Sequence, residues 1–422
     1  KVEETLRKTI EFLEVHQAII DCHVVDFLWD NHWELLPLPL REEFDANKEE
    51  IMKNLHGILL KSSSCGYQHL RDFLEKAGKH GLASFTELDA LEDFLPEEES
   101  TLKVSDFMTP KKMHEVKSAC RLITWMCRNA KSSTVVVDAG DGKGYLSSCL
   151  AFEYNFPVIG LEANADYQRS ARKRVDKLKK KWKTPERDGN YKSLAVTVTS
   201  ELSIREISMD IFPELHEVDF CLCGLHTCGD LAVTCLDIFV RDPHVKYLCN
   251  IGCCYNLLSK FPISKFLRSK GFTLSDKAKM LACQSLNRII SDGTYPKDSL
   301  HFRMIFEKLL KQKYPERKFE QLGKNRSDNF IEYFKSSCDK MNLDYFYSDR
   351  ELEEELINYD SRYFDLFYVV RSSLAAAVEA VILLDRILFL MEDNAKTIVK
   401  LVKVFEREIS PRCYAIVALK SE

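Results

Sequence analysis

The spacing of apolar residues separates a helical beginning of the chain from a later part in which short apolar runs alternate with helices. Up to about residue 94 the apolar side chains recur three or four positions apart, as in Leu6, Ile10 and Leu13, which is the spacing of one helix face. An acidic, proline-containing stretch over residues 95–100 predicts a linker. A further helix is expected from residue 109 or 110 to about residue 128, because a threonine and a proline stand where a helix cap and first turn need them.

From residue 134 onward the pattern predicts a parallel sheet. Short β-branched runs are separated by helical stretches, and this alternation is typical of strands joined by crossover helices. The strands are expected at residues 134–138, 158–162, 195–199, 220–224 and 247–251. Two later runs, at residues 397–405 and 413–419, suit an antiparallel hairpin that closes the sheet after an apolar helix over residues 374–391.

The predicted fold is therefore of the α/β class, with a Rossmann-like, mostly parallel sheet and an antiparallel closing hairpin. The region between the fifth strand and the last helix lacks strand patterns and is rich in Lys, Phe and Tyr, which predicts a mostly helical insertion. The chain then divides into a helical N-terminal region, a first part of the core, the insertion, and a last part with the closing helix and hairpin. These four segments are expected at residues 1–105, 106–260, 261–367 and 368–422.

A glycine-rich loop follows the first predicted strand of the sheet. Asp138 is followed at alternate positions by Gly140, Gly142 and Gly144, and a helical pattern begins directly afterwards. Glycines at such a turn let the backbone approach a ligand that a Cβ atom would push away, and the free N–H groups at the helix start face that ligand. The loop therefore predicts a site for a nucleoside cofactor.

An acid at the end of the second predicted strand strengthens this prediction. Glu162 stands about 18 residues beyond Gly144, where a carboxylate can accept hydrogen bonds from both hydroxyls of a ribose. The glycine spacing differs from the G-x-G-x-x-G of dinucleotide-binding turns, and Asp138 suits the cationic amino-acid end of S-adenosylmethionine better than a pyrophosphate. S-adenosylmethionine is therefore the predicted cofactor. In the alternative, Asp138 is only a turn or cap residue.

Six motifs of the chain resemble those of a known group of methyltransferases. They are MTPKKMHE at 108–115, DAGDGKG at 138–144, GLHTCGDL at 224–231, GCCYN at 252–256, LACQ at 281–284 and SPR at 410–412. From about residue 105 to residue 422 the chain is similar to the methyltransferase-like proteins grouped with the ribosomal RNA adenine dimethylase domain-containing proteins. A more distant similarity, in the His-x-Cys-Gly and Cys-Cys elements, is to a family of tRNA 2′-O-methyltransferases. The resemblance implies a class I methyltransferase fold and S-adenosylmethionine as cofactor, and it leaves the methyl acceptor open.

A second group of chemically active side chains follows the fourth and fifth predicted strands. They are His226, Cys228 and Asp230 after the fourth strand, and Cys253, Cys254, Tyr255 and Asn256 after the fifth. The carboxyl ends of these strands border one crevice in a sheet of this type, so the two groups are expected to meet there, with Gly224 on the cofactor side. His226 is the candidate base that removes a proton from the methyl acceptor, and Asp230 and Tyr255 are expected to line the acceptor side.

Each of these residues also has an alternative. His226 fits equally a histidine bonded only to backbone, and Asp230 fits a cap of the following helix. A nucleophilic Cys228 lacks the Pro-Cys dipeptide associated with pyrimidine methylation, and the acidic-Pro-Pro-aromatic motif of amino-methylating relatives is absent from the sequence. The cysteines match the paired spacing of zinc ligands only loosely, so no metal is expected.

The composition limits partners and location. The 422 residues are 45% hydrophobic and 30% charged with a net charge of -5, which describes a compact protein and excludes a globally basic nucleic-acid binder. No apolar signal segment opens this long chain, so its cysteines are expected to be reduced thiols and the protein intracellular, in the cytoplasm or nucleus. Three charged residues interrupt the apolar stretch at 374–391, so no membrane span is expected.

The methyl acceptor is expected to be RNA or protein. A basic run over residues 169–183 fits contacts with phosphates, although such a run is more often a solvated helix face. The similarity to tRNA methyltransferases favours RNA slightly. Aromatic residues of the insertion, such as Tyr333 and Tyr345, fit a core first and a stacking surface second. The competing functions are a catalytically silent binding or assembly module with this fold, a nucleotide-dependent oxidoreductase and a metal-binding module.

Overall fold

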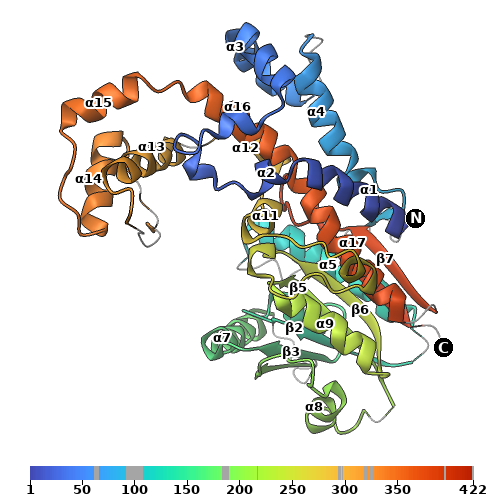
Figure 1. Cartoon of the computed structure of the whole chain (residues 1–422). Coiled ribbons are helices and arrows are strands. Elements are labelled where there is room, and N and C mark those ends of the chain that lie inside the picture. The colour runs from blue at the N-terminus through green and yellow to red at the C-terminus, as the bar shows by residue number, and fades with distance from the viewer. Residues whose placement is uncertain are drawn as a thin grey trace. The chain divides into compact units, whose positions relative to one another are not determined.

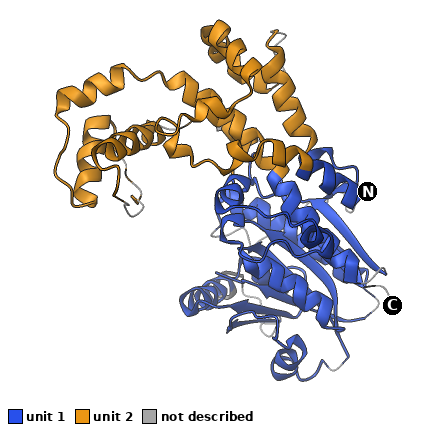
Figure 2. Ribbon diagram, viewed as in Figure 1, with its two compact units in different colours: residues 1–10, 81–283, 378–422 blue, residues 11–80, 284–377 orange. Residues whose placement is uncertain are grey.

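The structure is a computed structural model in which the chain forms two compact units, shown in blue and orange in Figure 2. The first unit comprises Lys1–Ile10, Gly81–Cys283 and Val378–Glu422, and the second comprises Glu11–His80 and Gln284–Ala377. The structure describes residues 1–60, 66–91, 108–130, 132–182, 190–215, 217–292, 296, 298–317, 322–323, 325, 327–393 and 396–420. The linker expected at residues 95–100 lies outside these ranges. The division into four sequence segments stays a prediction.

An eight-stranded sheet forms the centre of the first unit (Figure 1). Its strands are β1 (Leu88–Ala90), β2 (Thr134–Ala139), β3 (Val158–Glu162), β4 (Tyr191–Ala195), β5 (Asp219–Thr227), β6 (Val245–Gly252), β7 (Thr397–Lys403) and β8 (Tyr414–Lys420). Across the sheet they follow the order β1-β7-β8-β6-β5-β2-β3-β4, and only β8 runs antiparallel to its neighbours β6 and β7. This mostly parallel sheet with an antiparallel hairpin confirms the predicted class I methyltransferase fold.

Helices cover the sheet and complete the first unit. They are α1 (Val2–Val15, shared with the second unit), α5 (Pro110–Arg128), α6 (Tyr145–Phe152), α7 (Ala165–Trp182), α8 (Ile204–Ile211), α9 (Asp230–Arg241), α10 (Lys265–Ser269), α11 (Asp276–Ala282) and most of α17 (Ala375–Asp393). α5 packs on α6 and β5, α9 packs on β5 and β6, and α7 packs on β3 and β4. Every residue of β2 is buried, as expected for a central parallel strand covered on both faces. The helix expected from residue 109 or 110 is confirmed as α5, which Thr109 caps by accepting a hydrogen bond from the Lys112 backbone.

Two strand predictions are wrong. The third strand of the parallel set is Tyr191–Ala195 instead of residues 195–199, and β1 lies in a region that was expected to be helical. β3 ends at Glu162, directly opposite Ala195, so the β-branched residues after Ala195 have no strand to pair with. β1 is only three residues long and pairs with β7, a partner more than 300 positions later, which no local pattern reveals.

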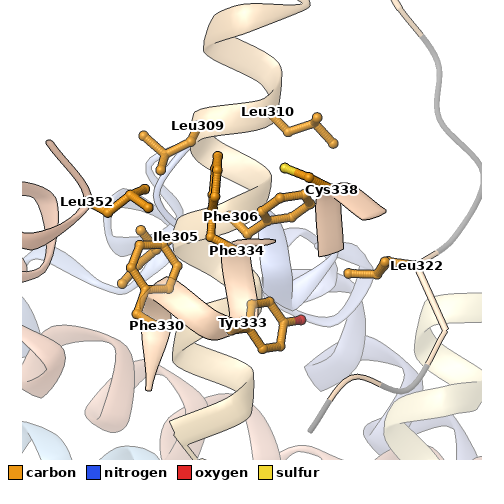
Figure 3. Close-up of a cluster of buried hydrophobic side chains, with 10 residues drawn as sticks. All are labelled: Ile305, Phe306, Leu309, Leu310, Leu322, Phe330, Tyr333, Phe334, Cys338 and Leu352. Carbon is orange, nitrogen blue, oxygen red and sulfur yellow. The ribbon is translucent and has the colours of Figure 1, made fainter. Parts of the chain in front are cut away.

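The second unit is helical. Its helices are α2 (Gln17–Asp21), α3 (Leu38–Leu59), α4 (Gln68–Lys79), α12 (Leu286–Asp292), α13 (Asp298–Lys313), α14 (Phe330–Lys340), α15 (Asp349–Ile357) and α16 (Ser361–Ser373). Figure 3 shows a core cluster in which Phe306 of α13 meets Tyr333 and Phe334 of α14, all of them buried. Of the two aromatic residues named for the insertion in the sequence, Tyr333 thus belongs to the core, whereas Tyr345 is 53% exposed. No helix of the described ranges is long and apolar enough to cross a membrane.

Candidate active site

The glycine loop turns sharply between β2 and α6. Gly140, Gly142 and Gly144 all have positive φ angles, of 81°, 59° and 68°, which residues with a Cβ atom rarely adopt. A Cβ atom on Gly142 would find no atom nearer than 3.8 Å, whereas one on Gly144 would lie 2.5 Å from the hydroxyl of Tyr191. Gly142 therefore faces open space that a ligand can fill, and Gly144 is needed for packing.

Glu162 closes the loop from the end of β3. One carboxylate oxygen accepts a hydrogen bond from the Gly142 backbone at 2.9 Å, and the other accepts one from the Asn164 backbone at 2.8 Å. Each oxygen of an ionised carboxylate has a second lone pair, so both remain able to accept from a further donor. The structure thus brings Glu162 and the glycine loop together, as the sequence predicts.

Asp138 lies beneath the loop and is only 2% exposed. Its Oδ2 atom accepts a hydrogen bond from the Ser147 hydroxyl at 2.9 Å, while its buried Oδ1 atom has no partner in the described chain. Burial, together with the nearby Asp141, raises the pKa of Asp138 well above its usual value. A buried carboxylate oxygen without a partner is costly, and a cationic ligand group placed beside it would remove that cost.

Asp141 is a buried acid of this loop that the sequence analysis missed. It accepts hydrogen bonds from the hydroxyls of Tyr191 and Ser193, the latter at 3.0 Å. Burial raises the pKa of Asp141 to about 6. Gly160 leaves room for it, since a Cβ atom there would lie 2.4 Å from the Asp141 Cγ atom. Its place between two loop glycines was the only signal in the sequence.

Gly224 serves the packing of the sheet. A Cβ atom on Gly224 would lie 2.4 Å from the Thr227 side chain and 2.8 Å from the carbonyl oxygen of Ala139. The space above Gly224 is thus already filled by the protein. Contact with the cofactor, as expected from the sequence, stays a prediction for this residue.

His226 stands at an irregularity of β5. Its φ angle is 71°, and the pairing of β5 with β6 shifts between Leu225 and Thr227. This turn directs the His226 ring to the buried Glu115 of α5, and Nε2 of the histidine lies 2.9 Å from a Glu115 carboxylate oxygen. The His226 side chain is 27% exposed, so it is reachable while its partner is not.

Glu115 is held in its ionised form by several donors. Lys112 donates to the same carboxylate oxygen at 2.9 Å, and the Ser410 hydroxyl donates to the other at 2.8 Å. Although burial raises the pKa of Glu115, the hydrogen bonds and charges of His226 and Lys112 outweigh it and lower the pKa to about 2. An ionised carboxylate only accepts, so Nε2 of His226 carries a hydrogen and a neutral His226 has its lone pair on Nδ1.

This role of Glu115 and Ser410 was not predicted from the sequence. Both residues lie in motifs that carry the family resemblance, at 108–115 and 410–412, and this was the available signal. Neither position is near His226 along the chain. Only the fold brings α5, the end of β5 and the β7–β8 hairpin together.

Asp230 begins α9 and fastens the loop that follows β6. Its Oδ1 atom accepts hydrogen bonds from the backbone N–H groups of Ser259 and Lys260 at 2.8 and 2.9 Å, and its Oδ2 atom accepts one from the Ser259 hydroxyl. Burial raises the pKa of Asp230, but these hydrogen bonds outweigh it and the pKa is lowered. Asp230 therefore acts on a neighbouring loop, and no contact with His226 is observed within the described chain.

Tyr255 differs from its expected place on the acceptor side. It is 2% exposed, and its hydroxyl donates to the buried carboxylate of Glu379 at 2.9 Å. The guanidinium groups of Arg386 and Arg412 lie 5.8 and 5.9 Å from the centre of its ring. Tyr255 thus anchors the loop after β6 in the core, because an aromatic ring with a bonded hydroxyl is stable there.

Known proteins resemble the part of the chain that carries this site. Residues 111–261 match the family model described as a methyltransferase domain. Over these residues the chain is similar to a methyltransferase domain. The matched residues include the glycine loop, Glu115, Glu162 and His226, and the match confirms S-adenosylmethionine as the predicted cofactor.

Similarity also extends beyond the methyltransferase domain. The chain is 27% identical to the probable methyltransferase-like protein 25 of Mus musculus, in an alignment that covers 100% of this chain and 97% of that protein. It is 26% identical to the Homo sapiens protein of the same name, with 76% of each chain covered. A solved structure of M. capricolum TrmK with S-adenosyl-homocysteine is 14% identical and covers 56% of this chain and 96% of its own, with a TM-score of 0.22.

Proposed function

We propose that this methyltransferase domain transfers the methyl group of S-adenosylmethionine to RNA. The observation that carries the proposal is the contact of the reachable His226 with the buried, ionised Glu115 at the end of β5, the strand that pairs with β2 before the cofactor loop. S-adenosylmethionine supplies an electrophilic methyl group when bound. A hydroxyl or amine acceptor must lose a proton in the reaction, and a neutral His226 with its lone pair on Nδ1 can accept it.

The residues around the loop fit the parts of the cofactor. The open space at Gly142 leaves room for it, and the orphaned Oδ1 atom of Asp138 suits its cationic amino-acid end. Glu162 retains lone pairs for the ribose hydroxyls. When His226 takes a proton, the Glu115 carboxylate stabilises the resulting imidazolium, because the two groups are 2.9 Å apart and one of them is buried.

RNA is favoured as acceptor by the exposed face of α7. Five described basic side chains are exposed on this helix: Arg169, Arg172, Lys173, Lys177 and Lys180. The side chains of residues 179 and 181–183, which belong to the predicted basic run, lie outside the described residues. A row of cations on one helix attracts the phosphates of a nucleic acid in a salt-dependent way.

Two measurements test the proposal. Calorimetric titration should show micromolar binding of S-adenosylmethionine and none of NAD, and Gly142→Arg should abolish binding because it fills the open space at the loop. Tritium from labelled cofactor should then appear in RNA taken from cells that lack this protein. Label that enters protein only would replace RNA by a protein acceptor. Cofactor binding without any transfer would favour a binding or assembly module.

A reversal of charge on α7 tests the RNA contact itself. The double substitution Lys173→Glu and Lys177→Glu should weaken RNA binding and reduce its salt dependence. Each contact with a phosphate contributes about one unit to the slope of the logarithm of the binding constant against the logarithm of the salt concentration. Calorimetric binding of S-adenosylmethionine should stay unchanged, because these side chains point to solvent. Unchanged RNA binding would remove α7 from the acceptor site.

A further inference from the structure

Three cysteine thiols meet where the loops after β5 and β6 approach each other. The Sγ atom of Cys228 lies 3.3 Å from the Sγ atoms of both Cys253 and Cys254, and those two atoms lie 3.4 Å apart. The three sulfur atoms therefore form a nearly equilateral triangle, which we call the thiol triangle. Cys228 is exposed and the other two are half-buried, so the triangle is reachable from solvent.

The other cysteines of the described chain lie in different surroundings. Ten are buried, among them Cys221 and Cys223 inside β5, where a thiol packs as a small apolar group. The four described cysteines that are not buried are those of the thiol triangle and Cys283. The Sγ atom of Cys283 lies 4.0 Å from the carbonyl oxygen of Cys253, so all four are neighbours. The reachable thiols of the described chain are thus gathered in one place.

The two loops that carry the thiol triangle are braced against each other. The carbonyl oxygen of Cys254 accepts a hydrogen bond from the Gly229 backbone at 3.3 Å. Asp230, two residues after Cys228, holds the backbone of Ser259 and Lys260 in the opposite loop. Because the protein already holds the three sulfur atoms together, a ligand of the triangle need not supply the free energy to assemble them.

The separations between the sulfur atoms fit a metal ion better than a disulfide. Zinc binds cysteine sulfur at about 2.3 Å, so two sulfur atoms of a tetrahedral site lie about 3.8 Å apart. The triangle would have to widen by roughly 0.4 Å to reach this value. A disulfide requires one pair at about 2.05 Å and would exclude the third sulfur, whereas the observed distances single out no pair. Three thiolates without a cation would repel each other.

We propose that Cys228, Cys253 and Cys254 bind one zinc ion as thiolates, with the fourth coordination position open to a ligand from solution. The three thiols release their protons to the solvent on binding. Cys283 is not a ligand, since its Sγ atom is directed to the side-chain oxygen of Asn256 at 3.4 Å. Soft thiolate ligands select zinc over magnesium or calcium, and three protein ligands with an open position are typical of catalytic zinc sites.

The proposed zinc site lies beside the candidate base. The Sγ atom of Cys228 donates a hydrogen bond to the carbonyl oxygen of His226 at 3.3 Å, so one corner of the thiol triangle adjoins the candidate base. A ligand of the zinc ion would therefore lie near the end of β5. The proposal is independent of which acceptor is methylated.

Metal analysis of the full chain tests the proposal. Protein purified under reducing conditions and loaded with zinc should retain one zinc ion per chain after gel filtration, as measured by elemental mass spectrometry. Cobalt in place of zinc should give the intense visible absorption of a tetrahedral thiolate site. Addition of 2-mercaptoethanol to the cobalt form should change that spectrum, because the added thiol can enter the open position.

Variants of single cysteines distinguish the ligands. Cys228→Ser, Cys253→Ser and Cys254→Ser should each lower the affinity for zinc by at least about a hundredfold in competition with a chelator, because one of three thiolates is lost. Cys283→Ser is the matched control and should bind zinc as the wild type does. Calorimetric binding of S-adenosylmethionine shows that each variant is folded.

Several outcomes would overturn the proposal. The protein does not use this site for zinc if no metal is retained after loading, or if the three Ser variants bind it as tightly as wild type. A mass two hydrogens below that of the reduced chain, with a disulfide between two of the three cysteines, would show a redox pair instead. Loss of zinc in Cys283→Ser, or a cobalt spectrum that added thiol leaves unchanged, would disprove the open fourth position.

Discussion

Replacement of Glu115 by glutamine should slow methyl transfer and leave cofactor binding intact. The substitution keeps the shape of the side chain but removes the negative charge 2.9 Å from Nε2 of His226. In the mechanism proposed above, this charge stabilises the imidazolium that forms when His226 accepts a proton. Without it the transition state loses electrostatic stabilisation, whereas the glycine loop and Glu162 are not touched.

The structure gives the magnitude of this effect. The pKa of Glu115 falls from its usual 4.5 to about 2, because the stabilisation of the carboxylate by its partners exceeds the cost of its burial. This fall corresponds to about 3 kcal/mol of net free energy in favour of the ionised carboxylate. His226 shares this interaction with Lys112, so we assign about 1.5 to 3 kcal/mol to the histidine. The rate of transfer should therefore fall about ten- to a hundredfold in Glu115→Gln.

Single-turnover kinetics measure this loss without interference from product release. Enzyme saturated with tritiated S-adenosylmethionine is mixed with the acceptor preparation that the wild type labels, and the label in the acceptor is counted over time. Calorimetry should give the wild-type dissociation constant for the cofactor. His226→Asn should lose at least as much rate, and the double variant should lose no more than His226→Asn alone, because the two residues act as a unit.

Two results would refute this reasoning. A folded Glu115→Gln enzyme with the wild-type rate would show that the carboxylate does not assist the base. Losses that multiply in the double variant would show that Glu115 and His226 act separately, with Glu115 serving only to hold α5 in place.

Three further predictions concern the cofactor loop. Glu162→Ala should weaken S-adenosylmethionine binding by about 1.5 to 3 kcal/mol in calorimetry, since hydrogen bonds to a charged group are lost; an unchanged affinity would exclude Glu162 from the site. In urea unfolding, Gly142→Ala should lower the free energy of unfolding by about 1 to 2 kcal/mol, because alanine is strained at its positive φ angle. Gly144→Ala should lower it by more, because the added methyl group would also meet Tyr191. Equal losses in the two variants would contradict the packing role of Gly144. Asp141→Asn tests the raised pKa: a carboxyl with a folded pKa of about 6 and a usual value of 3.8 contributes stability below pH 3.8 that is lost as the pH rises to about 6. The free energy of unfolding of Asp141→Asn should therefore gain about 3 kcal/mol on the wild type over that range, and parallel pH profiles would show that Asp141 titrates normally.

The sequence predicted the parts of the fold that depend on local patterns. These parts are the strands around the glycine loop, the helix from Pro110 and the closing hairpin. They could be predicted because the spacing of apolar residues, helix-capping residues and turn residues are all short-range features of the sequence. The position of β4 could not be predicted, because the end of β3 determines where pairing stops. Local patterns likewise gave no sign of β1, whose only described strand partner is β7.

The candidate site shows the same division. Glu162 and the glycines were expected because a known turn chemistry joins them, but Glu115 and Ser410 reach His226 only through packing of distant elements. Tyr255 was expected near the acceptor because it follows a strand end, yet a buried partner, Glu379, draws its side chain into the core. The meeting of Cys228 with Cys253 and Cys254 was expected, because the strands that precede them lie side by side in the sheet. The expectation of no metal rested on the spacing of these residues along the chain and stays a prediction.

The pairing of β1 with β7 also affects how the sheet folds while the chain is being synthesised. Leu88 lies opposite Leu401, so this edge of the sheet cannot close until the residues up to about Leu401 have left the ribosome. During synthesis, one edge of β6 stays unpaired until β8 has been made and pairs with it. A chain that ends before residue 397 would keep that edge open, and we expect such truncated products to aggregate even when the cofactor loop and its acid are complete.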